Sequence, residues 1–325
     1  MIWASSALIG GILLLVFSAG KFVDGAAVTA KYFGLPPLLI GILVIGFGSS
    51  MPEMVIAGIA AAQGKPGLAL GNAFGSNITN IALILGVTTI ISPIVVVSSV
   101  LRRELPFLLL ITAIMSMLFY YDETLNRVDG LVLIGVFFCL MGWSIYTGLH
   151  TEHDHFGDLV ELELSEPMPL RQAVTYLVLG LVALVISSRI MVWGGVEIAH
   201  ELGISDLIIG LTVVAIGTSL PELASCIAAV RKNEHDLALG NVIGSNLFNT
   251  SIVIGTTGVI SQSTLDPDIL TRDIPVVAIM TVILFLMCYG FRSKGIGGRI
   301  NRWEGVLLLC LYVGYNISLF LTATA

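Results

Sequence analysis

The stretch Gly48-Ser49-Ser50-Met51-Pro52-Glu53 lies in the middle of a long apolar run, and a second version, Gly217-Thr218-Ser219-Leu220-Pro221-Glu222, lies in another. Each version places a carboxylate beside a proline, at about the depth where a membrane span is driest. An ionised side chain at the bilayer centre costs at least about 2.5–3.5 kcal/mol on insertion scales. Two matched carboxylates therefore indicate a function, and we expect them to meet in one cation site. The alternative is a pair of structural acids, kept protonated or capped by hydroxyl groups.

The composition around these stretches is that of a membrane protein. The 325 residues are 56% hydrophobic and only 11% charged, with a mean hydropathy of +0.97, whereas soluble domains carry about 25% charged residues. Long, continuously apolar spans are helices, and the apolar runs are near the roughly 20 residues that cross a bilayer. The sequence therefore predicts an all-α multi-pass membrane protein with ten spans, near residues 5–23, 36–62, 68–94, 104–120, 127–147, 172–193, 206–230, 236–261, 273–291 and 304–323.

The two motifs belong to an internal repeat with a constant register of 222 − 53 = 169 residues. The matching positions include Gly41 with Gly210, the run 68–72 with 237–241, Gly75-Ser76-Asn77 with Gly244-Ser245-Asn246, and Asn80 with Asn249. Each half holds five predicted spans, an odd number, so the two copies must face opposite ways across the membrane. We therefore predict two inverted five-helix repeats, 1–148 and 172–325, joined by a linker at 149–171, with signature regions at 41–80 and 210–249.

The basic residues predict the orientation, because cytoplasmic loops carry an excess of Lys and Arg. With the N-terminus outside, 11 of the 15 basic residues fall on the cytoplasmic side. Both termini are then outside and the acidic central loop is cytoplasmic, in a cell membrane. The net charge of −7, with no basic stripe, gives no indication of nucleic-acid binding, and nothing in the sequence indicates an obligatory protein partner.

Three other features have ordinary explanations. The apolar run 7–17 resembles the core of a signal peptide, but no positive residue precedes it and the repeat continues through it. The linker begins with His150, His153 and His155; we expect a solvated connection there, with a metal site as the alternative. The four cysteines lie in apolar runs and are expected to pack as small hydrophobic residues rather than form disulfides.

The residues beside each glutamate suit a hard cation. Pro52 and Pro221 lack an N–H, which leaves the carbonyl groups of Gly48 and Gly217 without a helical partner. Freed carbonyls at membrane depth are tolerated where they line a cavity or bind ions. Hydroxyl groups lie within about one turn, and Ser76 and Asn80 share a helix face in the next span. Oxygen ligands of these kinds favour Na⁺ or Ca²⁺ over zinc or copper. For Asn72, Asn77, Asn241 and Asn246 we expect helix–helix hydrogen bonds instead.

These motifs resemble the two α-repeats of the sodium/calcium exchanger family, within the calcium/cation antiporters. The resemblance covers GSSMPE with GNAFGSN in the first half and GTSLPE with GNVIGSN in the second. It implies a bacterial or archaeal-type member in which the first span of each half slides to open the site to either side. It also implies these ion ligands: Glu53, Glu222, Ser49, Ser50, Thr218, Ser219, Ser76, Ser245, Asn80, Asn249 and the carbonyl groups of Gly46 and Ala215.

One position departs from that family. Many of its members carry Asp where this chain has Asn249. The predicted site then holds two carboxylates and a charge of at most −2, which balances one Ca²⁺ or two Na⁺. The stoichiometry, and the choice between Na⁺ and H⁺ as counter-ion, are left open by this substitution.

We therefore predict a secondary antiporter that exchanges Ca²⁺ for Na⁺ without a cofactor. A Ca²⁺ (or Na⁺)/H⁺ antiporter on the same fold is the main alternative, since glutamates at this depth favour the protonated form. A channel is less consistent with inverted halves around an occluded site. An intramembrane enzyme is not expected, because neither a His-Glu-x-x-His nor a Gly-x-Ser-x-Gly motif is present.

Overall fold

The computed structural model describes residues 2–34, 37–96, 103–150, 168–201, 215–289 and 298–324, and nearly all of them are helical. The first half contains α1 (Ile2–Tyr32), α2 (Pro37–Ile40), α3 (Phe47–Ser49), α4 (Met51–Ala62), α5 (Pro66–Ile78), α6 (Leu85–Ile91), α8 (Glu104–Asp122) and α9 (Arg127–His150). The second contains α11 (Leu170–Glu201), α13 (Ala215–Thr218), α14 (Leu220–Arg231), α15 (His235–Phe248), α16 (Ile254–Ile260), α17 (Ile274–Tyr289) and α18 (Arg302–Thr324).

Four π-helical turns interrupt these helices. They are η1 (Gly41–Gly46), η2 (Thr79–Ile84), η4 (Asn249–Val253) and η5 (Ile269–Asp273). Such turns are frequent at functional sites, because the wider turn shifts the side chains that follow it. The turns η2 and η4 begin at or beside Asn80 and Asn249, which are related by the repeat register.

The helices confirm a multi-pass membrane architecture. Within the described residues, seven helices are long and apolar enough to cross a bilayer, or eight if the pair Leu38–Ser49 and Met51–Ala62, bent by 48°, is one span. Of the other two predicted spans, 206–230 is described only from Ala215, and 304–323 coincides with α18.

The first span of each half is longer than its apolar run. The predicted span 5–23 belongs to a helix of 31 residues, and 172–193 belongs to one of 32 residues. Lys21, near the end of the predicted span, lies inside α1. Its ammonium group is 4.5 Å from the ring centroid of Tyr176 on α11. That contact gives the charge a partner, so the helix continues past it.

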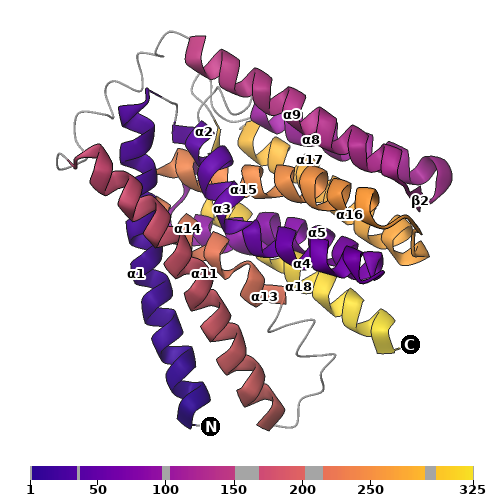
Figure 1. The fold of residues 1–325 in the computed structure, drawn as a ribbon, viewed down its shortest axis with the longest axis horizontal. Coiled ribbons are helices and arrows are strands. Elements are labelled where there is room, and N and C mark those ends of the chain that lie inside the picture. Colours follow the sequence, from indigo (N-terminus) through magenta and orange to yellow (C-terminus); the bar gives the residue numbers. More distant parts are fainter. Residues whose placement is uncertain are drawn as a thin grey trace.

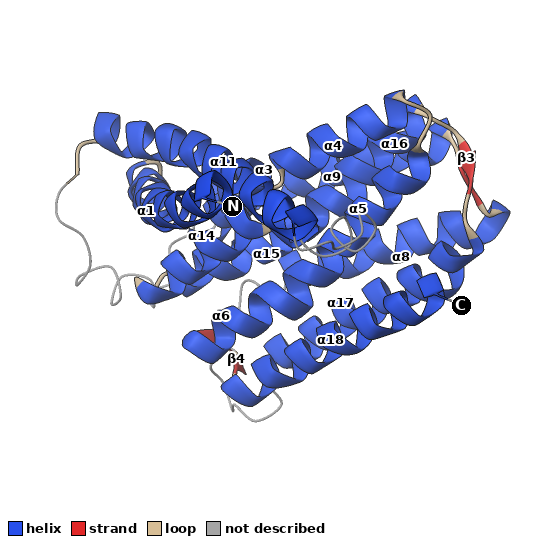
Figure 2. Ribbon diagram, turned by 90° about the horizontal axis from the view of Figure 1, so that it is seen from below, coloured by secondary structure: helices blue, strands red, loops and turns tan. Residues whose placement is uncertain are grey.

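The helices form two groups in space. The long helices α1 and α11 run obliquely at one side of the molecule, while the remaining helices form a bundle beside them (Figure 1; Figure 2). The two spans that carry the Gly-Ser-Asn motifs are the most enclosed: 94% of the apolar window of His235–Ile260 is buried, and 72% of that of Pro66–Ile91. Polar side chains on these spans therefore face protein rather than lipid.

Glycines bring the two halves into backbone contact at the centre of the bundle. A Cβ at Gly41 would lie 3.0 Å from the Cα of Gly240, and a Cβ at Gly244 would lie 2.7 Å from the Cα of Ile42. Only glycine allows η1 and α15 to approach this closely. The approach places the broken span of the first half directly against the motif of the second.

Glycines also set the crossing of α1 with α11. Gly11 packs on Ser187 and Met191, and its repeat counterpart Gly180 packs on Phe22. Residues early in α1 contact residues late in α11, and residues late in α1 contact residues early in α11, so the two helices run antiparallel.

Two short antiparallel ribbons link the halves at opposite ends of the bundle. In one, β1 (Ile94–Val95) pairs with β4 (Arg299–Ile300). In the other, β2 (Thr124–Leu125) pairs with β3 (Ser263–Thr264). Each ribbon thus joins a strand from one half to a strand from the other.

Candidate cation site

Both motif spans break at the same position. The helix is interrupted at Ser50, with φ −82° and ψ 3°, and at its repeat counterpart Ser219, with φ −90° and ψ 7°. In each case the following helix starts anew with proline in its first two positions. This confirms the predicted interruption, and it places Glu53 and Glu222 in the first turn of α4 and α14.

The two glutamates lie together although they come from different halves. Their exposed fractions are 1% and 2%, and Ser50, three residues before Glu53, reaches across to Glu222. The hydroxyl of Ser50 donates to Oε1 of Glu222 at 3.0 Å. The hydroxyl of Thr218 lies beside the carboxyl group of Glu53. Each carboxyl group therefore faces a hydroxyl from the opposite half.

Six buried oxygens of the predicted ligands form no hydrogen bond within the described residues. They are both carboxyl oxygens of Glu53, Oε2 of Glu222, the hydroxyl of Ser219 and the amide oxygens of Asn80 and Asn249. An unbonded buried polar atom is costly, so six of them among one set of predicted ligands is unusual in a folded core. Carboxylate, amide and hydroxyl oxygens are the ligands that Ca²⁺ and Na⁺ take.

The predicted ligands on the neighbouring spans are buried, but they differ in their hydrogen bonds. Ser245 donates to the carbonyl of Gly46 at 3.5 Å, and Ser76 is buried on α5. Asn80 donates to Asn246 at 3.1 Å. Asn249 has no hydrogen bond to either amide atom within the described chain, although it is only 1% exposed.

Two of the twelve predicted ligands have a less complete description. Ser49 donates to Oδ1 of Asn241 at 3.0 Å and lies beside Glu222. Ala215 is the first described residue of α13, so its backbone is in place two residues before Gly217, and its carbonyl stays a predicted ligand.

The remaining asparagines make helix–helix hydrogen bonds, which confirms their predicted role. Asn72 donates to the backbone carbonyl of Glu53 at 3.3 Å, and Asn241 donates to that of Glu222 at 3.2 Å. Asn77 donates to Thr250 at 2.9 Å across the two halves. The matched Asn–Glu contacts fix the first turn after each break, and so aim the two carboxylates.

Two residues at this centre were not anticipated from the sequence. The thiol of Cys226 donates to the carbonyl of Ala238 and accepts from Asn241. Ser188 on α11 donates to the carbonyl of Gly217 at 2.7 Å. A search for repeated residues misses both, because the register places alanine at their counterparts, positions 57 and 19. All four cysteines are free thiols, as expected.

Buried acids also occur away from the glutamates. Glu104 accepts from Ser144 at 3.1 Å, and its counterpart Asp273 accepts from Tyr315 at 3.1 Å. Each lies at the start of its span and bonds to the following one, which suits a connection between helices rather than an ion site. Of the linker histidines, His153 and His155 and the side chain of His150 lie outside the described part of the chain.

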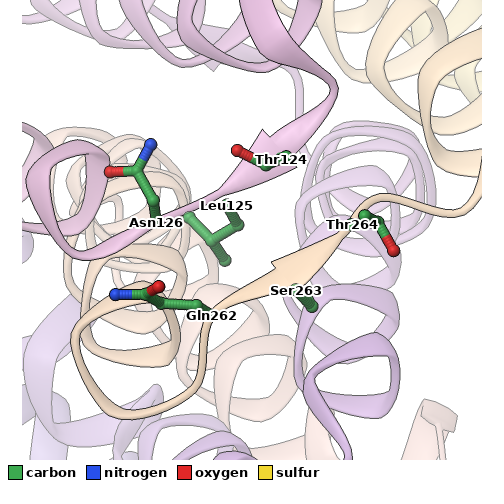
Figure 3. A pocket seen from close by; sticks show the side chains of 6 residues that line it. All are labelled: Thr124, Leu125, Asn126, Gln262, Ser263 and Thr264. Carbon is green, nitrogen blue, oxygen red and sulfur yellow. The ribbon is translucent and has the colours of Figure 1, made fainter.

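A pocket of about 260 Å³ lies elsewhere, at the ribbon of β2 and β3. Figure 3 shows the six residues that line it, which are neutral and come from the two strands and the residues directly beside them. It contains none of the predicted ligands.

Comparison with known proteins settles the family. The model of the family described as "Sodium/calcium exchanger protein" matches residues 3–146 and 172–321. The chain belongs to the sodium/calcium exchanger family. The two matched segments leave out the predicted linker, and the family consists of transporters, which excludes the enzyme alternative.

Full-length relatives support this membership. The exchanger is 42% identical to the putative antiporter CaxA of Alkalimonas amylolytica over 98% of this chain and 99% of that protein. It is 39% identical to the inner membrane protein YrbG of Escherichia coli, over 96% and 98%. It is 30% identical to the sodium/calcium exchanger MaX1 of Methanosarcina acetivorans, over 95% and 96%.

The solved structures agree. The structure of the sodium-calcium exchanger NCX_Mj soaked with Na⁺ and Ca²⁺ superposes with a TM-score of 0.82 at 30% identity, covering 96% of this chain and 97% of that one. This exchanger is therefore a membrane transporter with the architecture of that protein.

Proposed function

We propose that this exchanger is a secondary antiporter that moves Ca²⁺ against Na⁺ through a site built on Glu53 and Glu222. The observation that carries the proposal is that predicted ligands from both halves, including the two glutamates, have buried oxygens without hydrogen bonds. Ca²⁺ takes about 6–8 oxygens, and these residues supply ligands of that kind. The carbonyl groups of Gly46 and Ala215 and the hydroxyls of Ser49, Ser76 and Ser245 would complete the shell.

We propose further that the chain consists of two inverted five-helix repeats, 1–148 and 172–325, with a linker at 149–171. The antiparallel crossing of α1 with α11, through repeat-related Gly11 and Gly180, supports this arrangement. So do the matched breaks at Ser50 and Ser219. Inverted repeats place the site at their interface near the midplane.

Exchange follows from competition for the same negative charge. The two carboxylates balance one Ca²⁺ or two Na⁺, so the ions bind alternately rather than together. Carrying the bare carboxylates across the bilayer is costly, which disfavours return of the empty carrier. Cytoplasmic Ca²⁺ would then leave as Na⁺ enters down its gradient. Both termini would lie outside and the linker in the cytoplasm.

The test is Ca²⁺ flux in proteoliposomes loaded with Na⁺. We expect Ca²⁺ uptake that depends on the Na⁺ gradient and is abolished by Glu53→Gln and by Glu222→Gln. Thr124→Ala, at the distant pocket, is the control and should transport normally. Uptake that is independent of Na⁺, or that survives both glutamine substitutions, rejects the proposal.

A Ca²⁺ (or Na⁺)/H⁺ antiporter is the second candidate. It is favoured by the lack of donors at both carboxyl oxygens of Glu53, because protonation would also neutralise a buried, unbonded carboxylate. Replacing the Na⁺ gradient by a pH gradient decides between them. Uptake driven by the pH gradient alone would support the H⁺ antiporter.

A further inference from the structure

At the second break, the hydroxyl of Ser188 on α11 replaces a backbone hydrogen bond that the proline removes. Gly217 lies four residues before Pro221, which has no N–H, so its carbonyl has no donor at the usual helical position. The hydroxyl of Ser188 donates to that carbonyl at 2.7 Å. Ser188 is only 4% exposed, so water does not compete freely for the bond. A side chain of α11 thus holds the backbone next to Thr218.

The same helix passes over both breaks. A Cβ at Gly217 would lie 2.1 Å from Cγ2 of Val192, and a Cβ at Gly48 would lie 2.9 Å from Cδ1 of Leu181. Both glycines are therefore the points where α11 rests on a broken span. Since the repeat relates α11 to α1, this arrangement is asymmetric: one member of the pair covers both breaks.

The first half has no equivalent of the hydroxyl. The register of 169 residues places Ala19 of α1 opposite Ser188, since 188 − 169 = 19. Alanine has no side-chain donor. Ala19 is buried, at 1% exposed, so it occupies a comparable packed position without the bond.

We propose that Ser188 is a positioning residue that couples α11 to the carbonyl of Gly217. The bond thereby favours the state described here over its counterpart, the second state of the transport cycle. This rests on the proposed function, in which two states related by the repeat alternate. In the counterpart, α1 takes the place of α11, and Ala19 instead of Ser188 faces a break. The described state thus keeps one hydrogen bond that the other cannot form, a difference of roughly five-fold in population.

Such a bias has a measurable signature on the two sides of the membrane. The apparent affinity for an ion is reduced by the fraction of molecules in the competent state. Removing the bond must therefore raise the apparent Ca²⁺ affinity on one side and lower it on the other. A substitution that only loosens the fold would change both in the same direction.

The experiment compares Ser188→Ala with Ser187→Ala in oriented proteoliposomes, measuring the apparent Ca²⁺ affinity from each side. Ser187 is the matched control, because it is equally buried on α11 but donates to Leu184 within its own helix. We expect Ser188→Ala to change the ratio of the two affinities about five-fold and Ser187→Ala to leave it unchanged. Ser188→Thr, which keeps the hydroxyl, should restore the ratio.

Ala19→Ser provides an independent test that does not depend on how Ser188→Ala folds. A hydroxyl at position 19 would stabilise the counterpart state, so it should shift the ratio in the same direction as Ser188→Ala. An unchanged ratio in Ser188→Ala, or an equal change in Ser187→Ala, overturns the proposal. If Ser188→Ala does not fold, an unchanged ratio in Ala19→Ser overturns it instead.

Hydrogen–deuterium exchange separates this proposal from the function on which it rests. In ion-free nanodiscs, Ser188→Ala should speed the exchange of the amides of residues 217–222, and Ser187→Ala should not. If the variants differ in this way but the wild-type protein shows no Na⁺-driven Ca²⁺ flux, the proposed function is rejected and the positioning role is kept. The converse result would reject only the positioning role.

Discussion

Replacing Gly244 by alanine tests whether the spacing of two helices sets the ion affinity. The added Cβ would lie 2.7 Å from both Cα and the carbonyl oxygen of Ile42. Carbon atoms pack at about 3.5–4.0 Å, and backbone cannot rotate away as a side chain can. The turn η1 must therefore move from α15 by roughly 1 Å.

That displacement acts directly on the site. Ser49 donates to Asn241 at 3.0 Å, and Ser245 donates to the carbonyl of Gly46 at 3.5 Å. Both bonds cross the same helix contact, and neither survives a lengthening of that size with normal geometry. Overpacking of this kind costs about 1–3 kcal/mol. If the whole cost falls on the ion-bound geometry, Ca²⁺ binding weakens by roughly 5- to 150-fold.

The assay is the Ca²⁺ dissociation constant by isothermal titration, with the unfolding temperature measured in the absence of ions. Gly135→Ala is the control, because Gly135 is exposed on α9 and a Cβ there meets nothing within 4 Å in the described chain. It should keep wild-type affinity. Unaltered Ca²⁺ affinity in Gly244→Ala would refute the view that close backbone contact shapes the site.

Two further substitutions probe charge. Asn249→Asp should add a third carboxylate where both amide atoms are unbonded, so that Ca²⁺ uptake depends more steeply on the Na⁺ concentration; an unchanged Hill coefficient for Na⁺ contradicts this. Burial raises the pKa of Glu234, in the turn before α15, from its ordinary 4.5, although Lys232 opposes the shift. The stability from its protonated form is full below the unfolded pKa and is lost as pH rises through the folded pKa. Glu234→Gln should flatten the fall in melting temperature over that range, and parallel curves for the two proteins would contradict the assignment.

The repeat register predicts much of the local structure. Proline and glycine act on the backbone through steric limits that need no partner, so the sequence locates the breaks at Ser50 and Ser219. The cost of charge in a bilayer likewise singles out Glu53 and Glu222 from the other acidic residues. The hydrogen bonds of Asn72 and Asn241 were foreseen as contacts between helices, but their acceptors were not.

Apart from the expected meeting of the two glutamates, the contacts between the halves could not be predicted from the sequence. The ribbon of β1 with β4 joins segments about 200 residues apart, and strands of two residues leave no periodic pattern. The role of Ser188 was not predicted, because its hydroxyl bonds to the carbonyl of Gly217, which lies near it only in the packed structure. The length of α1 was underestimated because the helix continues to Tyr32, beyond the apolar run that predicted the span 5–23.

The sequence alone determined that this chain spans a membrane, that it repeats itself, and that each copy breaks a helix beside one glutamate. Those properties follow from solvation and from the stereochemistry of proline, which act within a few neighbouring residues. The tertiary structure alone decided that hydroxyls of one half face the carboxylate of the other, and that α11 rather than α1 rests on both breaks. Such pairings depend on how closely glycine lets two backbones approach, a distance fixed only when all the helices are packed together.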